Sequence, residues 1–182
     1  MNTIALGAAA SVAAGLATLS HVEAARASSE PIAHVRNAFD FTVRAPYDVA
    51  APLFGPEAER AWAGPEWNPR FLYPTSSPDA PGSVFVVERD AHKLFWIATS
   101  FDLDSGHIQY VYVLDDLLVT LIDIHLSKPT PGQTGVSVVY ERTALRPEGN
   151  ERVERMGLAD RGFGKKWSAA ITDYLAKRRP RA

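Results

Sequence analysis

The middle of the chain is a close succession of short segments rich in β-branched and aromatic residues, separated by a few Asp, Gly, Ser or Pro residues. This pattern is typical of strands and turns. Links this short favour antiparallel pairing, because parallel strands need long crossover connections. An earlier segment with alternating apolar residues adds a strand at the start. The predicted strands are Val35–Ala45, Ser83–Asp90, Lys93–Asp102, His107–Asp115, Leu117–Ser127 and Gly135–Leu145.

The remaining segments are predicted to be helical or irregular. Closely spaced prolines and a glycine after Pro46 limit the chain through Trp62 to two short helical pieces. Pro65 to Gly82 is predicted to be mostly loop. Glu148 to Lys177 is predicted to be one long helix, because acidic residues crowd its start and basic residues its end, as the helix dipole favours. The order predicts an α+β fold.

Composition limits the partners and the chemistry. The length of 182 residues suits one ordinary domain, and a net charge of −2 argues against a nucleic-acid partner. The chain has no Cys, so disulfides, thiol nucleophiles and Cys-ligated zinc are excluded. Its five His residues lack the spacing of a local metal motif, and there is no Gly-x-Ser-x-Gly elbow. The sequence therefore predicts no metal and no cofactor.

The N-terminus is typical of a secretory signal peptide. An uncharged, Ala-rich run from Ile4 to Leu19 precedes the small-x-small pattern Ala25-Arg26-Ala27. The run is too short to predict a membrane span. No basic residue precedes it, which leaves a cytoplasmic protein with an N-terminal extension as the alternative to a periplasmic or secreted one. The predicted organisation is a signal peptide over 1–27, a linker over 28–34, one domain over 35–178 and a basic tail over 179–182.

Several local motifs resemble one known superfamily. The stretch EAERAWAGPEWNPRFLYP, from Glu57 to Pro74, is similar to the Gly-Glu-x-x-Trp…Trp-x-Pro signature of an uncharacterised bacterial branch of the SRPBCC (START-like, pollen-allergen-like) superfamily, with Ala58 where that branch usually has Gly. The words GSVF, GQTGVSVVYERTAL and PEGN, starting at Gly82, Gly132 and Pro147, agree with it.

The resemblance implies the helix-grip fold. In this fold a curved antiparallel sheet, here of six to seven strands, surrounds a long C-terminal helix and encloses a cavity, with two short helices after the first strand. The superfamily includes polyketide cyclases and dehydratases. Fold analogy alone assigns no reaction.

The predicted C-terminal helix carries an apolar stripe with two unusual features. Val153, Met156, Phe163, Trp167, Ile171 and Tyr174 share one face at 100° per residue. Gly157 and Gly164 lie on the edge of that stripe and Asp160 lies near its centre, although glycine and an unpaired acid both disfavour simple packing. One hypothesis is that Asp160 faces a ligand. The alternative is that Asp160 is solvated or pairs with an Arg, and that the glycines allow close approach to the sheet.

The candidate site residues follow from this stripe and from the excess of aromatic side chains. Asp123 and His125 also share one face of a predicted strand, where they are either an acid/base pair or a polar pair on the solvent side. The candidate catalytic residues are Asp160, His125 and Tyr140. The candidate ligand-binding residues are Trp62, Trp96, Tyr110, Tyr140, Met156, Asp160, Phe163, Gly164 and Trp167.

Three functions remain open. The first is binding of a small hydrophobic, amphipathic or lipid-like molecule in the cavity. The second is a cyclase- or dehydratase-like enzyme acting on an apolar substrate there. The third is an interaction module with a filled core, which a cavity below about 150 Å³ would favour.

Overall fold

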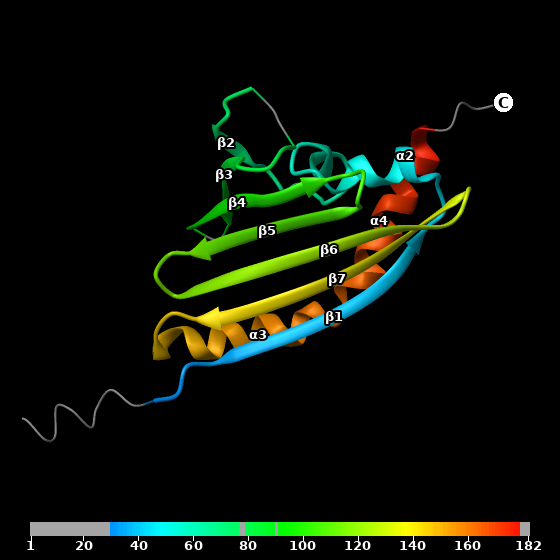
Figure 1. Cartoon of the computed structure of the whole chain (residues 1–182). Coiled ribbons are helices and arrows are strands. Elements are labelled where there is room, and N and C mark those ends of the chain that lie inside the picture. The colour runs from blue at the N-terminus through cyan, green and yellow to red at the C-terminus, as the bar shows by residue number, and fades with distance from the viewer. Residues whose placement is uncertain (1–29, 77–78, 90, 179–182) are drawn as a thin grey trace, which may run out of the picture. The chain divides into compact units, whose positions relative to one another are not determined.

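A computed structural model describes residues 30–76, 79–89 and 91–178. Within them, seven antiparallel strands form one sheet in the order β1-β7-β6-β5-β4-β3-β2 (Figure 1). The chain has the helix-grip α+β fold. The strands are β1 (His34–Val43), β2 (Arg70–Tyr73), β3 (Val84–Arg89), β4 (His92–Asp102), β5 (His107–Leu114), β6 (Leu118–Thr130) and β7 (Gln133–Ala144).

Strict alternation divides the sheet into two faces. Every second residue of β5, beginning with Ile108, is buried, and the residues between them are partly exposed. The buried positions of β6 are the even-numbered ones from Leu118 to Leu126. Because successive side chains of a strand point to opposite faces, these positions define an inner face toward the core and an outer face toward solvent.

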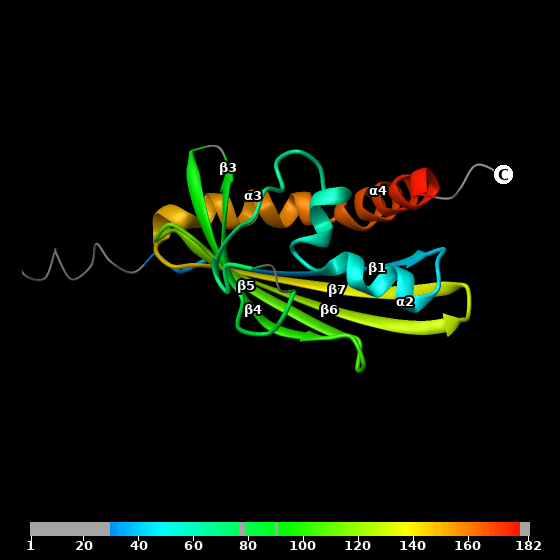
Figure 2. The ribbon, with the colours of Figure 1, turned by 90° about the horizontal axis from the view of Figure 1, so that it is seen from above.

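The helices cover the inner face of the sheet. Figure 2 shows α3 and α4 lying together on one side of the sheet. Short helical turns follow β1, as predicted. The helical elements are α2 (Tyr47–Ala50), η1 (Ala51–Phe54), η2 (Ala58–Ala61), η3 (Pro147–Gly149), α3 (Asn150–Asp160) and α4 (Phe163–Arg178).

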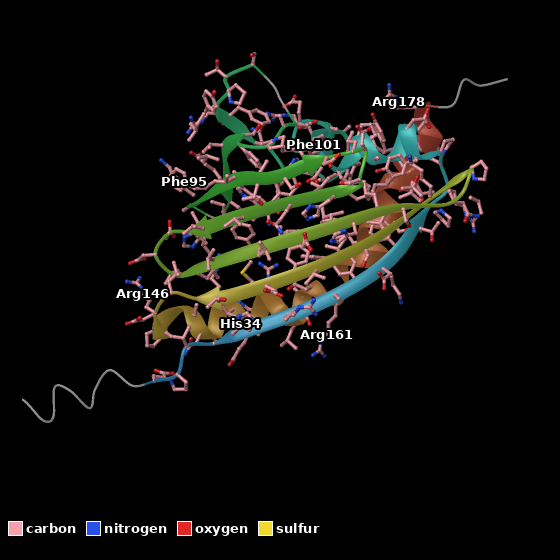
Figure 3. The ribbon with its side chains drawn as sticks, in the orientation of Figure 1. His34, Phe95, Phe101, Arg146, Arg161 and Arg178 are labelled. Atoms are coloured by element: carbon pink, nitrogen blue, oxygen red, sulfur yellow. The ribbon has the colours of Figure 1, made fainter. Side chains whose placement is uncertain are left out.

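One prediction of local structure was wrong, and another was incomplete. The single helix predicted over Glu148 to Lys177 is interrupted by a turn at Arg161 and Gly162, where glycine weakens the helix (Arg161 is labelled in Figure 3). Among its described residues the stretch from Pro65 to Gly82 is mostly loop, as predicted, but it also contains β2, a short edge strand that pairs with β3. Prolines on both sides of β2 hid this strand from a propensity argument.

The two glycines of the helical stripe lie where the helices approach β1 most closely. A Cβ atom on Gly157 would lie 2.6 Å from Cγ1 of Val35, and one on Gly164 would lie 3.1 Å from Cδ2 of Phe39. Both glycines are buried. The close-approach alternative for these glycines is therefore confirmed.

Some predictions fall on other parts of the chain. The signal peptide over 1–27 and the basic tail over 179–182 lie outside the described residues. None of the helices in the part of the chain that the structure describes combines the length and apolar character needed to cross a bilayer.

Candidate functional site

A cavity of about 370 Å³ lies between the inner face of the sheet and the helices. This volume is well above the roughly 150 Å³ that would indicate a filled core, and falls in the range of small-molecule sites. Nine of its lining residues are aromatic. The aromatic lining residues are Trp62, Trp67, Phe85, Trp96, Tyr110, Tyr112, Tyr140, Phe163 and Trp167.

Trp167 joins α4 to the sheet at one end of the cavity. Its ring centroid lies 5.8 Å from that of Phe39 on β1 and 5.7 Å from that of Trp62, which follows η2. The indole N–H of Trp62 donates to the carbonyl oxygen of Leu53 at 2.7 Å, so the indole is also fixed to the turns after β1. These edge-on aromatic contacts give the cavity a rigid wall.

Trp96 on β4 forms another part of the wall. Its ring stacks on Phe85 with centroids 5.7 Å apart and lies 4.4 Å from the ring of Tyr112. Its indole N–H is buried and has no hydrogen-bond partner among the described residues. An unmade hydrogen bond of this kind costs about 1–3 kcal/mol.

A buried polar layer crosses the inner face beside the aromatic wall. Arg142 donates through Nε and Nη2 to the two carboxylate oxygens of Asp160, at 2.9 and 2.7 Å. Its Nη1 donates to the hydroxyls of Thr120, at 2.9 Å, and Tyr112. The side chains of Arg142 and Asp160 are only 3% and 1% exposed. Burial would lower the pKa of Arg142, but the hydrogen bond to Asp160 and the nearby tyrosines raise it above its ordinary value.

This layer decides between the two hypotheses for Asp160. Both carboxylate oxygens are occupied by Arg142. Asp160 is not among the residues that line the cavity, although Arg142 is. The alternative of an Asp160–Arg pair is therefore confirmed, and Asp160 acts on the site through the position of Arg142.

Glu59 on η2 is a cavity residue that the sequence analysis did not single out. It is 8% exposed and lines the cavity. No described residue forms a hydrogen bond or an ion pair with its carboxyl group, in contrast to Asp160. Burial raises the pKa of Glu59 well above its usual range, and the negative charge of Asp79 raises it further. The group is therefore held toward its neutral form, which can both donate and accept a hydrogen bond.

The tyrosines near Glu59 differ in their availability. Tyr110 donates its hydroxyl to the carbonyl oxygen of Phe54 at 2.9 Å. The hydroxyl of Tyr140 has no hydrogen-bond partner among the described residues. Burial raises the pKa of Tyr140 well above its usual range, although the positive charge of Arg142 opposes this. Tyr140 therefore presents a neutral hydroxyl to the cavity, beside the guanidinium of Arg142, which lies 4.7 Å from its ring centroid.

Three cationic side chains also line the cavity where its wall meets solvent. Arg89 and Lys166 are exposed, and Arg152 is half-buried. Arg89 has a long ion pair of 3.5 Å with Glu66, and Arg152 lies 3.1 Å from a ring nitrogen of His92. These three residues, the cationic rim, place positive charge at the solvent-exposed part of the cavity wall.

Most predicted ligand-binding residues line the cavity: Trp62, Trp96, Tyr110, Tyr140, Met156, Phe163 and Trp167. Gly164 is not among the lining residues and packs on β1 instead. Of the candidate catalytic residues, only Tyr140 lines the cavity. His125 and its neighbour Asp123 lie on the outer face of β6, so the structure contradicts an acid/base role for this pair inside the cavity.

No family model matches the sequence, and no curated protein matches it. Solved structures do match. Norcoclaurine synthase from Thalictrum flavum, in complex with dopamine and hydroxybenzaldehyde, aligns with a TM-score of 0.60 and 12% identity over 96% of this chain and 100% of that chain. An uncharacterised protein from Rhizobium leguminosarum aligns with a TM-score of 0.57 and 15% identity over 81% and 98% of the two chains.

The protein Ara h 8.0201 aligns with a TM-score of 0.52 and 13% identity over 80% of this chain and 100% of that chain. The chain has the SRPBCC fold. Identities this low establish the fold and no activity.

Because the fold assigns no activity, the chemistry of the cavity is inferred from the residues that line it. The aromatic wall favours an apolar body. Glu59 and Tyr140 are the neutral polar groups inside, and the cationic rim favours a negative charge at the entrance. Glu59 could have been predicted from the Glu57 to Pro74 motif, because it occupies the position of the glutamate in the Gly-Glu-x-x-Trp signature.

Proposed function

We propose that this protein binds a small amphipathic molecule in the cavity, with its apolar body against the aromatic wall and an anionic group at the cationic rim. The observation that carries the proposal is a cavity of about 370 Å³ with an aromatic wall, in which the Glu59 carboxyl and the Tyr140 hydroxyl have no partner among the described residues. A site of this kind suits a mainly apolar ligand that also offers hydrogen-bonding groups.

The polar groups inside the cavity further limit the chemical class of the ligand. A neutral Glu59 donates to a carbonyl, ether or hydroxyl oxygen of the ligand, and Tyr140 adds a second donor. Each such hydrogen bond contributes about 0.5–1.5 kcal/mol to binding. Arg142 lines the same cavity, but Asp160, Tyr112 and Thr120 already occupy four of its five N–H donors. It therefore supports the wall more than it attracts a charge.

A cavity-filling pair of variants tests the proposal. Ala170 lines the cavity, whereas its neighbour Ala169 on α4 is exposed and outside it. We expect Ala170→Phe to weaken binding of the anionic fluorescent probe ANS by about tenfold or more, because the ring occupies the site. The matched control Ala169→Phe is expected to bind ANS as the wild type does. Ala63→Leu, at a second lining position, repeats the test should Ala170→Phe not fold.

The outcomes separate binding from non-specific adsorption. Near-UV circular dichroism first establishes that each variant is folded, since loosely packed states also bind ANS. Equal ANS affinity in folded Ala170→Phe, Ala63→Leu and the wild type would overturn the proposal. Weaker binding in Ala169→Phe alone would place the probe on the surface of α4 instead.

A second candidate function is a cyclase- or dehydratase-like enzyme. The observation that favours it is Glu59, a carboxyl whose raised pKa and position in an apolar cavity suit a general acid or base. This role passes to Glu59 because Asp160 is occupied by Arg142 and His125 lies on the outer face. Once a ligand is known, the test is whether the wild type converts it to a product. Loss of turnover in Glu59→Gln with ligand affinity retained would show that Glu59 takes part in the reaction. Equal turnover by both proteins would show that Glu59 has no catalytic role.

A further inference from the structure

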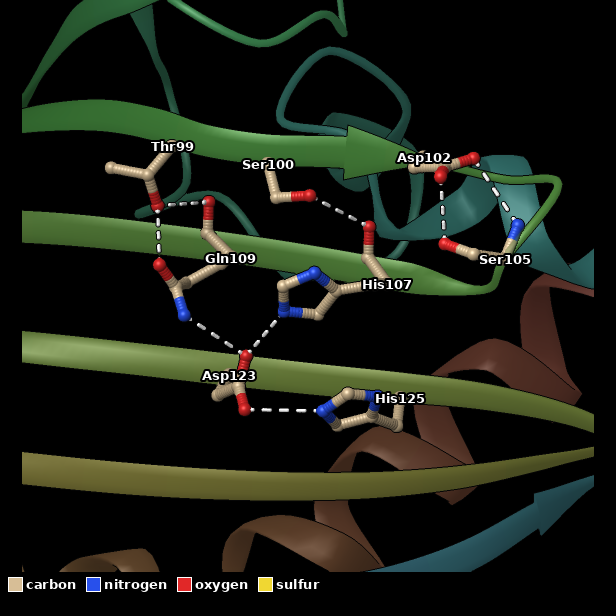
Figure 4. Close-up of polar contacts among 8 residues, drawn as sticks. All are labelled: Thr99, Ser100, Asp102, Ser105, His107, Gln109, Asp123 and His125. Carbon is tan, nitrogen blue, oxygen red and sulfur yellow. Dashed lines mark hydrogen bonds and ion pairs between the residues drawn. The ribbon is translucent and has the colours of Figure 1, made fainter.

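The outer face of the sheet carries a cluster that the cavity does not use. His107 on β5 and Asp123 and His125 on β6 are brought together by strand pairing, in which His107 is opposite His125 and Gln109 is opposite Asp123. Nε2 of His107 lies 2.7 Å from Oδ1 of Asp123, and Nε2 of His125 lies 3.2 Å from Oδ2 (Figure 4). Two imidazoles thus converge on one carboxylate.

The cluster is ordered by its neighbours. The two imidazole rings are nearly parallel, with centroids 4.8 Å apart and an interplanar angle of 15°. Gln109 donates its amide to Oδ1 of Asp123 at 3.2 Å, and Thr99 donates its hydroxyl to the amide oxygen of Gln109 at 2.9 Å (Figure 4). In metal sites, hydrogen bonds from surrounding residues of this kind orient the side chains that bind the ion.

We propose that His107, Asp123 and His125 form a binding site for a divalent transition-metal ion such as Zn²⁺ or Cu²⁺. One donor atom from each residue lies within 4.8 Å of the others, so small side-chain rotations bring all three to one ion. Imidazole and carboxylate are the ligands that these metals prefer, with Zn–N distances of about 2.0–2.1 Å. The ion takes the place of the Nε2 protons: a neutral imidazole then carries its single proton on Nδ1, and an imidazolium releases its second proton to solvent.

The position of the cluster sets what such a site can do. The side chain of His125 is 60% exposed, so an ion there keeps open coordination positions toward solvent. The ligands come from two adjacent strands, so binding stabilises the folded chain, and the stabilisation grows with the logarithm of metal concentration over the dissociation constant. The site is on the opposite face from the cavity and does not depend on the proposed ligand.

Zn²⁺ titration of the full chain by calorimetry tests the proposal, with one variant in the cluster and one matched control. His125→Ala removes an exposed ligand without touching the core, and we expect it to weaken Zn²⁺ binding by about tenfold or more. The control is His92→Ala, because His92 also faces a single carboxylate, Asp115, at 2.7 Å. We expect His92→Ala to bind Zn²⁺ as the wild type does and Mg²⁺ to compete in neither.

Two further measurements keep the outcomes decisive. At one fixed Zn²⁺ concentration, the rise in Tm is expected to be similar in the wild type and His92→Ala and clearly smaller in His125→Ala. Electron paramagnetic resonance of the Cu²⁺ form is expected to show coordination by two imidazole nitrogens, reduced to one in His125→Ala. Equal Zn²⁺ affinity in the wild type and His125→Ala would overturn the proposal, as would loss of binding in His92→Ala alone.

Discussion

The two faces of the sheet carry similar side chains in opposite environments. On the inner face, Arg142 and Asp160 form a pair whose side chains are almost fully buried. On the outer face, Asp123 meets two imidazoles and keeps a quarter of its side-chain surface exposed. The inner pair joins β7 to α3, the outer cluster joins β5 to β6, and both pair an acid with a base. They differ most in their access to water.

This difference determines which cluster is structural and which is exchangeable. Two charges removed from water depend on each other, because the loss of one leaves the other buried and unpaired. Charges at the surface are solvated, so each partner can be replaced at small cost. The inner pair therefore holds α3 on the sheet, while the outer cluster is free to exchange its protons for another ligand.

Breaking the inner pair is expected to have the largest effect. Asp160→Asn leaves Arg142 buried without a counter-charge, and we expect the free energy of unfolding to fall by about 3–5 kcal/mol. Urea unfolding followed by circular dichroism measures it. The double variant Arg142→Met with Asp160→Leu is expected to recover much of this loss, because it leaves no buried charge. A loss below about 1 kcal/mol in Asp160→Asn would show that the pair is not buried in solution.

The second-largest effect is expected at the contact between α3 and β1. Gly157→Ala forces a Cβ atom against Val35, and we expect it to destabilise the fold by about 1–3 kcal/mol. Gly162 is the control, since a Cβ there would meet only the carbonyl oxygen of Ala159, at an ordinary 3.6 Å. Thermal unfolding of both variants measures the difference, and equal Tm values would contradict the close approach of α3.

These cases also show which features could be predicted from the sequence. β-branched and aromatic content located β5 and β6, and alternation along β6 placed Asp123 and His125 on one face, but did not show which face was the inner one. The partner of Asp160 was not visible, since Arg142 lies on a strand whose position relative to the helix depends on the whole fold. The cluster around Asp123 escaped for the same reason: its third member, His107, joins it through the register of two strands.

Glu59 was missed because it lies in a turn of η2, which has no apolar period to reveal a face. The break at Gly162 was missed because charges at both ends of the segment indicated one helix. Local patterns therefore predicted the elements, while residues whose partners are distant needed the structure.

The pH dependence of stability distinguishes the unpaired acid of the inner face from the paired ones. Because the pKa of Glu59 is raised in the folded state, its ionisation opposes folding, and stability is lost as pH rises above the unfolded pKa near 4.5. Glu59→Gln removes this loss. The free energy of unfolding of Glu59→Gln, relative to that of the wild type, is expected to increase with pH. The total increase is about 1.4 kcal/mol for each unit by which folding raises the pKa of Glu59. Parallel stability curves from about pH 5 to 8 would contradict an apolar environment for Glu59.

The outer cluster is expected to give the smallest effect. Burial alone would raise the pKa of Asp123, but hydrogen bonds from His107 and Gln109 outweigh it and lower the pKa below its usual range. Its contribution to stability is therefore present at neutral pH and is lost as pH falls through the folded pKa. We expect Asp123→Asn to cost less than about 1 kcal/mol at neutral pH without metal. Urea unfolding in EDTA measures it, and a loss similar to that of Asp160→Asn would erase the distinction between the faces.

The most direct test of the central claim, that the inner face encloses a ligand site, is a native mass spectrum of the full chain purified gently from a bacterial host. The account predicts a wild-type species that carries a bound mass of a few hundred daltons, and an empty Ala170→Phe variant. The same spectrum reports whether residues 1–27 are removed, as the signal-peptide prediction requires. An identical bound mass in the wild type and in folded Ala170→Phe, or an empty wild type that also fails to bind ANS, would contradict the account.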